Sequence, residues 1–472
     1  MGRLKFLAKN TGILAVSNFV SKILVFLLVP LYTRVLSTSD VGIYDLIVST
    51  VTLLGPIVTC NIADGVMRFS MDPECSRTEV ARVGFKYSLT GVLVGWIILL
   101  IVRVAGWWPD INGLEFYISL YFLLFVFNQF LLQTAKGNEK IMDIGVSGII
   151  GTIFTIFFNI LFLVFLQQGL PGFFIANILA QAVSVVYLAI RLNFFSYAKG
   201  IFKTDPVLRK EMLIYSIPLI ATTLGWWVNS TSDRYIVAWL VGVDGNGLLS
   251  ISYKIPSIIN IIQGIFIQAW QISAIKEFDS SDKPSFYGRA FSALNAVMVL
   301  ACAGLILLTR PLAYVLYGGD FYVAWRFVPF LLISCVLNTA SGFLGPILSA
   351  KKDTKMLATS AIYGSIVNIV FNILLVFLIG IQGACISTVI ASFVIYAFRK
   401  KAVKDDIDVP DYSLTYFSWI ILCAQAVIEI YTDVWYLEFV LIAVILFMYR
   451  ARFFDLYRVV KSAFFKQKTI VM

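Results

Sequence analysis

Residues 11–69 read TGILAVSNFVSKILVFLLVPLYTRVLSTSDVGIYDLIVSTVTLLGPIVTCNIADGVMRF. The segment contains two apolar runs, and each is long enough to cross a bilayer, because a spanning helix needs roughly 20 mostly apolar residues. A short polar turn, Ser37–Asp40, joins them. Lys22 lies near the middle of the first run, where a lysine costs about 2.5–3.5 kcal/mol and therefore needs a partner or a watery cavity. The segment predicts a membrane bundle with a polar interior.

The composition of the whole chain agrees with this prediction. Of its 472 residues, 60% are hydrophobic and 14% are charged, whereas soluble domains carry about 25% charged residues. Most of the 37 Lys and Arg residues fall in eight clusters, each after an even number of predicted crossings. Because this is the positive-inside pattern, the net charge of +10 reports topology and no nucleic-acid partner is expected. Both termini are predicted to be cytoplasmic.

Hydropathy predicts an all-α polytopic membrane protein with about fourteen transmembrane helices. Their approximate bounds are 11–36, 41–65, 83–106, 114–135, 142–167, 170–195, 211–240, 246–272, 288–310, 323–349, 356–379, 382–399, 413–431 and 435–452. The chain has no histidine and its six cysteines are scattered, so no metal site is predicted. No phosphate-binding glycine loop occurs either, and neither a cofactor nor a catalytic residue is expected.

The chain also contains an internal repeat. Three pairs of segments correspond: Ala135–Lys140 with Ala350–Lys355, Phe158–Leu161 with Phe371–Leu374 and, more weakly, Gly42–Leu46 with Gly247–Ile251. Six helices per copy is an even number, so both copies enter the membrane in the same direction, as parallel repeats do. Chance similarity between apolar helices is the alternative. The predicted divisions are a six-helix lobe at 1–195, a cytoplasmic linker at 196–210, a second six-helix lobe at 211–400, and two extra helices with a basic cytoplasmic tail at 401–472.

The first two predicted helices of each copy carry polar residues at helical spacing. These are Asn18 and Lys22, then Asp45, then Asn229, Asp233 and Arg234, and finally Lys254 and Ser257. Lipid offers such side chains no hydrogen-bond partner, so polar stripes on equivalent helices are difficult to explain by packing alone. They indicate a polar interior.

The order of these motifs resembles that of a known family. Ser21-Lys22, Val29–Leu36 and Gly42–Tyr44 look like the opening of the bacterial polysaccharide repeat-unit flippases of the Wzx type, and Asp233–Val237 with Tyr253–Pro256 is similar to the start of their second half. Residues Leu248 and Leu249 depart from the pattern, which has a tyrosine there. The resemblance covers about residues 5–400. These flippases belong to the multidrug/oligosaccharidyl-lipid/polysaccharide (MOP) exporter superfamily, so the resemblance implies two MATE-like lobes around a central cavity.

The resemblance implies a carrier, and no enzyme. It would flip undecaprenyl-pyrophosphate-linked oligosaccharide repeat units across the bacterial cytoplasmic (inner) membrane by alternating access, for O-antigen, capsule or exopolysaccharide biosynthesis. Its implied partners are the lipid-linked oligosaccharide, membrane lipids, H⁺ or Na⁺, and the polysaccharide polymerase machinery. A multidrug or cation antiporter and a lipid II flippase share the fold and remain alternatives, although the lysines favour an anionic cargo. A membrane-embedded polymerase or ligase is a remote alternative, because the predicted outer loops are short.

Lys22 and Lys254 are hypothesised to attract the pyrophosphate, assisted by Arg234, because an ammonium binds phosphate as a point charge. Polar side chains such as Asn18, Asn229 and Ser257 would meet sugar hydroxyls, and Trp226, Trp227 and Trp270 would stack on sugar faces. The structural alternatives are that Lys22 pairs with Asp64 or Asp45, that Lys254 pairs with Asp233, and that Arg234 is an interfacial anchor.

Three carboxylates are candidates for ion coupling: Asp45, Asp64 and Asp233 would bind a proton or Na⁺. Three others flank the last predicted turn, namely Glu429, Asp433 and Glu438, and we expect them to be solvated.

Overall fold

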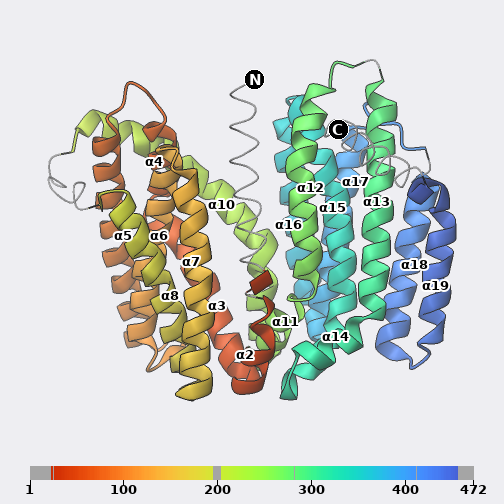
Figure 1. Cartoon of the computed structure of the whole chain (residues 1–472), viewed down its shortest axis with the longest axis horizontal. Helices are drawn as coiled ribbons and strands as arrows, with labels where there is room; N and C mark the ends of the chain where they lie inside the picture. Colours follow the sequence, from red (N-terminus) through yellow and green to blue (C-terminus); the bar gives the residue numbers. More distant parts are fainter. Residues whose placement is uncertain (1–22, 25, 195–203, 281, 411, 455–472) are drawn as a thin grey trace, which may run out of the picture. The chain divides into compact units, whose positions relative to one another are not determined.

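The computed structural model describes residues 23–24, 26–194, 204–280, 282–410 and 412–454. These residues form helices and turns in two compact units (Figure 1). Unit 1 comprises residues 1–238 and 242–247, and unit 2 comprises residues 239–241 and 248–472. Most of α10 (Pro206–Leu240) therefore belongs to unit 1, although the repeat assigns it to the second lobe. The boundaries of the two lobes stay a prediction.

Among the described residues, eleven helices are long and apolar enough to cross a membrane. Each corresponds to one of the predicted spans. Of the other three, the first lies largely outside the described residues. The eighth is divided by the turn Tyr253–Ile255 into α11 (Val243–Ser252) and α12 (Pro256–Lys276), and the last is the short α19 (Tyr436–Met448). The prediction of an all-α, multi-pass membrane protein is confirmed.

Unit 1 contains the helices of the first copy together with α10. In chain order these are α2 (Val29–Val35), α3 (Thr38–Val58), α4 (Ile62–Ser70), α5 (Arg77–Ala105), the short η1 (Pro109–Ile111), α6 (Glu115–Gly137), α7 (Ile141–Asn159), the π-helical η2 (Ile160–Phe165) and α8 (Gly169–Arg191). Helix α6 is central, since it packs against α3, α4, α5 and α8. Side chains from α4, α5, α6, α8 and α10, including Ile62, Phe130 and Met212, form one fully buried apolar cluster. This cluster joins α10 to unit 1.

The second predicted span is broken where α3 ends. Thr59 caps α3 by donating its hydroxyl to the carbonyl of Gly55, 2.7 Å away. Cys60 and Asn61 then adopt left-handed backbone angles, with φ of 54° and 50°. Asparagine tolerates this region better than most residues because its short amide bonds locally. The chain re-enters a helix at Ile62, which gives α4 a direction of its own.

Unit 2 surrounds a helix whose membrane stretch is the most buried among the described residues. Its remaining elements are α13 (Lys283–Leu307), α14 (Thr309–Leu316), η3 (Gly319–Phe327), α15 (Val328–Ala350), α16 (Thr354–Ile379), α17 (Ile381–Ala402) and α18 (Tyr412–Tyr431). Helix α15 packs against α12, α13, α17 and α18. The indole of Trp419 on α18 donates to Asn295 on α13, and the amide of Asn295 donates to the hydroxyl of Tyr449, so polar bonds fasten α18 and the end of α19 to the unit.

One turn of unit 1 matches one turn of unit 2 in length and backbone conformation. Helices α6 and α7 are joined by three residues, as are α15 and α16, and the middle residue of each turn is left-handed: Glu139 has φ 59° and Lys352 has φ 60°. The buried Asn159 and Asn372 lie at the same position along α7 and α16. The following glycines with positive φ, Gly169 and Gly380, then differ by two positions, and the longer copy contains η2. A π-helical turn is the usual way to accept an inserted residue. These correspondences support the duplication.

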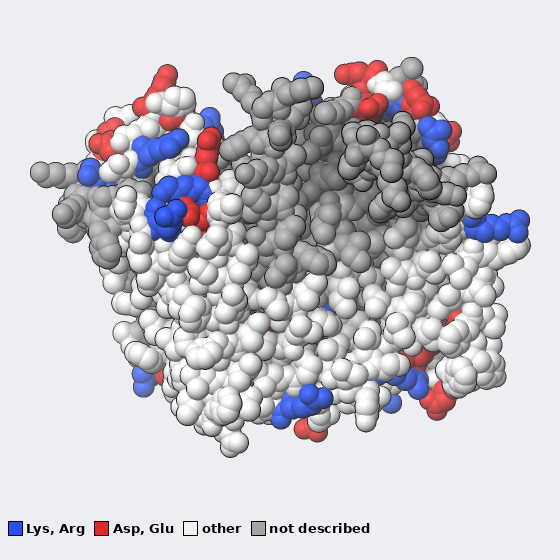
Figure 2. Space-filling model, viewed as in Figure 1, with Lys and Arg blue, Asp and Glu red and all other residues white. Residues whose placement is uncertain are grey.

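Charged side chains avoid the middle of the helices. On the face that Figure 2 shows, Lys, Arg, Asp and Glu gather at the two ends, and a wide band between them carries few. A band without charges is the surface that a hydrocarbon core requires. Charges within that band therefore need partners inside the protein, and these partners define the candidate site.

Candidate functional site: a charged cluster between membrane helices

An ion pair joins α3 to α10 inside unit 1. Arg234 Nη1 lies 2.6 Å from Asp45 Oδ1 and donates to Ser49 Oγ at 3.3 Å. The pair is largely enclosed, since the side chains of Arg234 and Asp45 are 24% and 13% exposed. We call the group formed by Asp45, Ser49, Thr50, Trp227, Arg234, Tyr235 and Asn246 the Asp45–Arg234 cluster.

Both oxygens of the Asp45 carboxylate are engaged in this cluster. Asn246, a fully buried residue of α11, donates to Asp45 Oδ2 at 3.3 Å and to the carbonyl of Gly42 at 3.0 Å. Arg234 holds the other oxygen. A carboxylate bonded on both sides is fixed in position, so Asp45 presents a set geometry to the guanidinium.

Two aromatic side chains of α10 complete the cluster. The indole of Trp227 donates to the carbonyl of Ser49 at 3.0 Å, and the hydroxyls of Tyr235 and Thr50 lie 2.7 Å apart. Their rings are neighbours at 5.3 Å. All these contacts fall on one face of α3, which contains Asp45 and Ser49.

Two glycines allow the helices that carry the cluster to meet. A side chain at Gly42 would overlap the carbonyl oxygen of Val243, and one at Gly247 would overlap the carbonyl oxygen of Thr38. Each glycine thus packs on the residue four positions before the other, so the contact is reciprocal. Reciprocal contacts are typical of two elements related by a two-fold axis. Gly42 and Gly247 are also equivalent in the predicted repeat, and each is the fifth residue of its helix.

The remaining predicted carboxylates have separate environments. Asp64 on α4 accepts hydrogen bonds from the amides of Asn61 at 2.9 Å and Gln133 at 2.6 Å. Asp233 is 5% exposed, and its Oδ1 accepts from the backbone amide of Arg234 at 3.0 Å. The donors around Asp64 are neutral amides, whereas Asp45 faces a charged arginine. The two carboxylates therefore have different electrostatic environments.

The other predicted site residues that the structure describes lie at separate positions. Lys254 and Ser257 lie at the break between α11 and α12, where the hydroxyl of Ser257 donates to the carbonyl of Lys254 at 2.5 Å. Asn229 is half-buried on α10, and Trp226 is 71% exposed. Asn18 and Lys22 lie outside the described residues. The roles of all these residues stay predictions.

Two expectations are wrong. Trp270 does not offer a free face, because its ring stacks on Phe343 at 4.0 Å and its indole donates to the carbonyl of that residue at 2.8 Å. Glu429 and Glu438 are not solvated, since they are 5% and 0% exposed. The apolar residues around them in sequence gave no signal of this burial, which depends on packing against α13 and α14.

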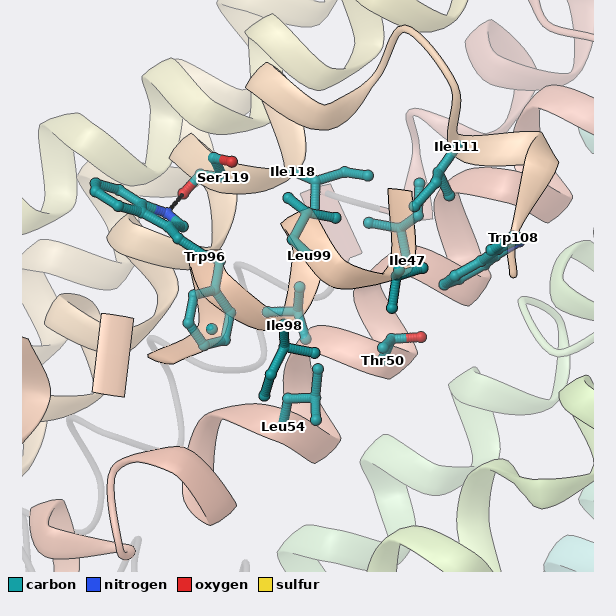
Figure 3. A pocket seen from close by; sticks show the side chains of 14 residues that line it. Ile47, Thr50, Leu54, Trp96, Ile98, Leu99, Trp108, Ile111, Ile118 and Ser119 are labelled. Carbon is teal, nitrogen blue, oxygen red and sulfur yellow. Dashed lines mark hydrogen bonds between the residues drawn. The ribbon is translucent and has the colours of Figure 1, made fainter. Parts of the chain in front are cut away.

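An apolar pocket lies beside the cluster in unit 1 (Figure 3). Its cavity volume is about 70 Å³ between α3, α5, η1 and α6, and its labelled lining residues include Trp96, Leu99 and Ile118. Thr50, whose hydroxyl contacts Tyr235, is one of its two polar lining residues. Such a lining suits a hydrocarbon and offers almost nothing to a sugar or phosphate.

A family model for polysaccharide biosynthesis proteins matches residues 7–271, more than half of the chain. The chain belongs to this family. The match covers all of α2 to α11 and therefore every residue of the Asp45–Arg234 cluster. The resemblance to MOP-superfamily polysaccharide flippases that the sequence motifs indicated is confirmed.

Known relatives agree with this membership. The probable low-salt glycan biosynthesis flippase Agl15 of Haloferax volcanii is 20% identical over 404 residues, covering 82% of this chain and 81% of the relative. The solved structure of the lipid II flippase MurJ in an inward closed conformation has a TM-score of 0.68 and 16% identity, covering 95% of this chain and 99% of that one. An inward-facing multidrug resistance MATE family transporter of the MOP superfamily has a TM-score of 0.63 and 13% identity, covering 81% and 95%. Similarity at these identities shows a shared fold.

Proposed function

We propose that this protein is a flippase that carries a lipid-linked glycan across the membrane by alternating access. Membership of the polysaccharide biosynthesis family and similarity to a glycan flippase support this function, and they favour a transporter over an enzyme. The observation that carries the proposal is the Asp45–Arg234 pair between apolar helices. A charged pair in a membrane span is costly, so it is expected to serve the transported polar group.

The proposed cargo is an undecaprenyl-pyrophosphate-linked oligosaccharide repeat unit. Arginine binds phosphate through two parallel hydrogen bonds, so Arg234 is suited to the pyrophosphate, with Lys22 and Lys254 as further cations. Because Asp45 already holds Arg234, the pyrophosphate and the Asp45 carboxylate would compete for one guanidinium. Asn18, Asn229 and Ser257 would bind sugar hydroxyls, and Trp226 would stack on a sugar.

This competition suggests how an ion gradient drives the cycle. A proton or Na⁺ bound to Asp45 would weaken its attraction for Arg234 and release the guanidinium for the cargo. Asp64 and Asp233 are the alternative ion sites, and Asp64 accepts hydrogen bonds from the amides of Asn61 and Gln133. The proposed setting is a bacterial cytoplasmic membrane, with both termini in the cytoplasm and the polysaccharide polymerase machinery as the receiving partner.

Two other transport functions compete with this one. Lipid II also carries a pyrophosphate, and the fold shared with MurJ makes a lipid II flippase the nearer alternative. A multidrug or cation antiporter shares the fold as well, but an arginine in the site disfavours a cationic cargo. A polymerase or ligase is the remote alternative.

Deletion of the gene tests the proposal. We expect lipid-linked oligosaccharide to accumulate in the inner leaflet, and its mass identifies the cargo. Wild-type protein should restore export, and Arg234→Ala should not. The matched control is Arg103→Ala, because Arg103 also pairs with a carboxylate, Glu115 at 3.2 Å, but is 61% exposed. Accumulation of lipid II in place of the oligosaccharide would assign the first alternative, and normal export in the deletion strain would refute a glycan flippase.

A further inference from the structure

A second charged cluster lies in unit 2, away from the polar stripes used above. Arg310 at the start of α14 reaches the end of α18, where its Nη1 lies 3.0 Å from Asp433 and its Nη2 donates to the carbonyls of Glu429 and Thr432 at 2.6 and 3.0 Å. Its guanidinium also stacks over Trp325 at 4.5 Å. Arg310 therefore caps α18 and is fixed in one orientation.

Two buried carboxyl groups face each other beside this arginine. Glu429 on α18 and Glu438 on α19 are 5% and 0% exposed. Gln425, one helical turn before Glu429, donates to Glu438 Oε2 at 3.4 Å, so the two carboxyl groups are neighbours. We call them the Glu429–Glu438 pair. Asp433, in the turn between the two helices, has a side chain that is 97% exposed. The pair therefore lies just inside the protein from an aqueous surface.

One oxygen of the pair, Glu438 Oε1, has no hydrogen-bond donor among the described residues. Glu438 Oε2 accepts from the amide of Gln425 at 3.4 Å, and Arg310 Nε lies 3.2 Å from Glu429 Oε1 without hydrogen-bond geometry. Among the described residues nothing donates to the buried Glu438 Oε1, and the buried Gln425 Oε1 has no donor either. A proton between the two carboxyl groups would supply the donor that Glu438 lacks.

Electrostatics lead to the same result. Two neighbouring carboxylates in a buried site repel each other, so an arrangement with one proton between them is favoured. Arg310 favours the negative charge on Glu429, whereas the first turn of α19 favours it on Glu438, which is the third residue of that helix. Arg310 is also paired with Asp433, at 3.0 Å, so one arginine is shared by Glu429 and an exposed carboxylate.

We propose that Glu429 and Glu438 form a proton-binding site, which holds one shared proton and exchanges it with the aqueous side on which Asp433 lies. The site is outside the predicted repeat, so it has no equivalent in the first copy. A role for this proton in driving transport rests on the proposed function. The binding of the proton does not, and it is measured separately.

Infrared spectroscopy of the purified full-length protein in lipid nanodiscs tests the site directly. At neutral pH we expect a carbonyl band of a protonated carboxylic acid that disappears in Glu438→Gln and, equally, in Glu429→Gln. Asp433→Asn is the control and should keep the band, because Asp433 is solvated. No band in the wild type at neutral pH, or a band that survives both glutamine substitutions, would overturn the proposal.

Thermal unfolding gives a second measurement. The shared proton is favoured in the folded state, so the wild-type Tm should fall as alkaline pH removes it. Glu438→Gln supplies a neutral donor in its place and should reduce that fall. A Tm that depends on Na⁺ instead of pH would show a cation in the site and contradict the proposal. In vesicles, a pH profile of flipping unchanged by Glu438→Gln would exclude coupling while leaving the infrared result intact.

Discussion

The Asp45–Arg234 pair shows how a single contact can be structural and functional at once. Removing one partner of an enclosed ion pair leaves the other charge without its partner, which costs roughly 1–3 kcal/mol. A loss of transport in a single variant is therefore ambiguous. The pair and its neighbour Asn246 need a design that separates folding from cargo binding.

A double-mutant cycle makes this separation. Asp45→Asn and Arg234→Gln should each lower both thermal stability and flipping, because each leaves an unpaired charge. The combined variant leaves neither residue as an unpaired charge, so its stability should return toward that of the wild type. Flipping should remain at least tenfold lower than in the wild type, because the guanidinium is missing. Thermal unfolding and vesicle flipping assays measure the two quantities. Recovery of flipping in the combined variant would show that the pair is only structural.

Sequence reasoning located part of this site. Helical spacing placed Asp45 on a polar face of the second predicted helix and Arg234 beside that of the seventh, which is a local property of each helix. The partner of each residue could not be predicted, because pairing depends on which helices touch. Asn246 was missed for the same reason: it follows a glycine-rich turn and carries no periodic signal. Trp270 was assigned wrongly because a buried and an exposed tryptophan have the same sequence context.

At the scale of the helix, the crossing of α3 and α11 determines how the Asp45–Arg234 cluster is assembled. Gly42 and Gly247 meet backbone carbonyls, which cannot move aside as a side chain can. The close approach brings Asn246 to Asp45, so the crossing also sets the geometry of the cluster.

Alanine at either glycine should separate the two helices. We expect Gly42→Ala and Gly247→Ala to destabilise the protein by about 1–3 kcal/mol, the usual cost of overpacking. Gly148→Ala and Gly304→Ala are matched controls, since a side chain there meets nothing within 4 Å, and a helical alanine is more favourable than glycine. Thermal unfolding in detergent provides the comparison. Equal stability of all four variants would contradict the close crossing.

The helices themselves were predictable because length and hydropathy determine them, and eleven of the fourteen spans correspond to described helices. The breaks within two of the predicted spans were not predictable. The turn at Thr59–Asn61 and the division of the eighth span at Tyr253–Ile255 lie within apolar or mixed sequence. They depend on backbone angles that hydropathy does not report.

At the scale of the whole molecule, the two C-terminal helices are integral to unit 2. Helix α18 packs on α13 and α15, and it supplies Trp419 to the buried Asn295 and Glu429 to Arg310. These bonds join elements that are more than a hundred residues apart in the chain. The sequence placed both helices outside the duplication and gave no indication of their contacts.

A chain that ends at Asp408 should therefore not fold stably. It would leave Asn295 and Arg310 without their partners and would uncover the apolar face of α13. We expect its yield in the membrane to fall at least tenfold, measured by fluorescence-detected size exclusion. Residues 409–472 expressed as a separate chain should restore the peak in part. A monodisperse peak from the shortened chain alone would show that α18 and α19 are dispensable.

The unequal covering of α5 and α13 has a consequence for the surrounding bilayer. These two helices occupy equivalent places in the predicted repeat, yet the membrane stretch of α5 is 22% buried and that of α13 is 56% buried, because α18 and α19 shield the latter. Helix α5 therefore exposes more of its membrane stretch than α13 does. Changes in acyl-chain length or fluidity should therefore affect α5 more than α13. Membrane composition should then alter unit 1 more strongly than unit 2.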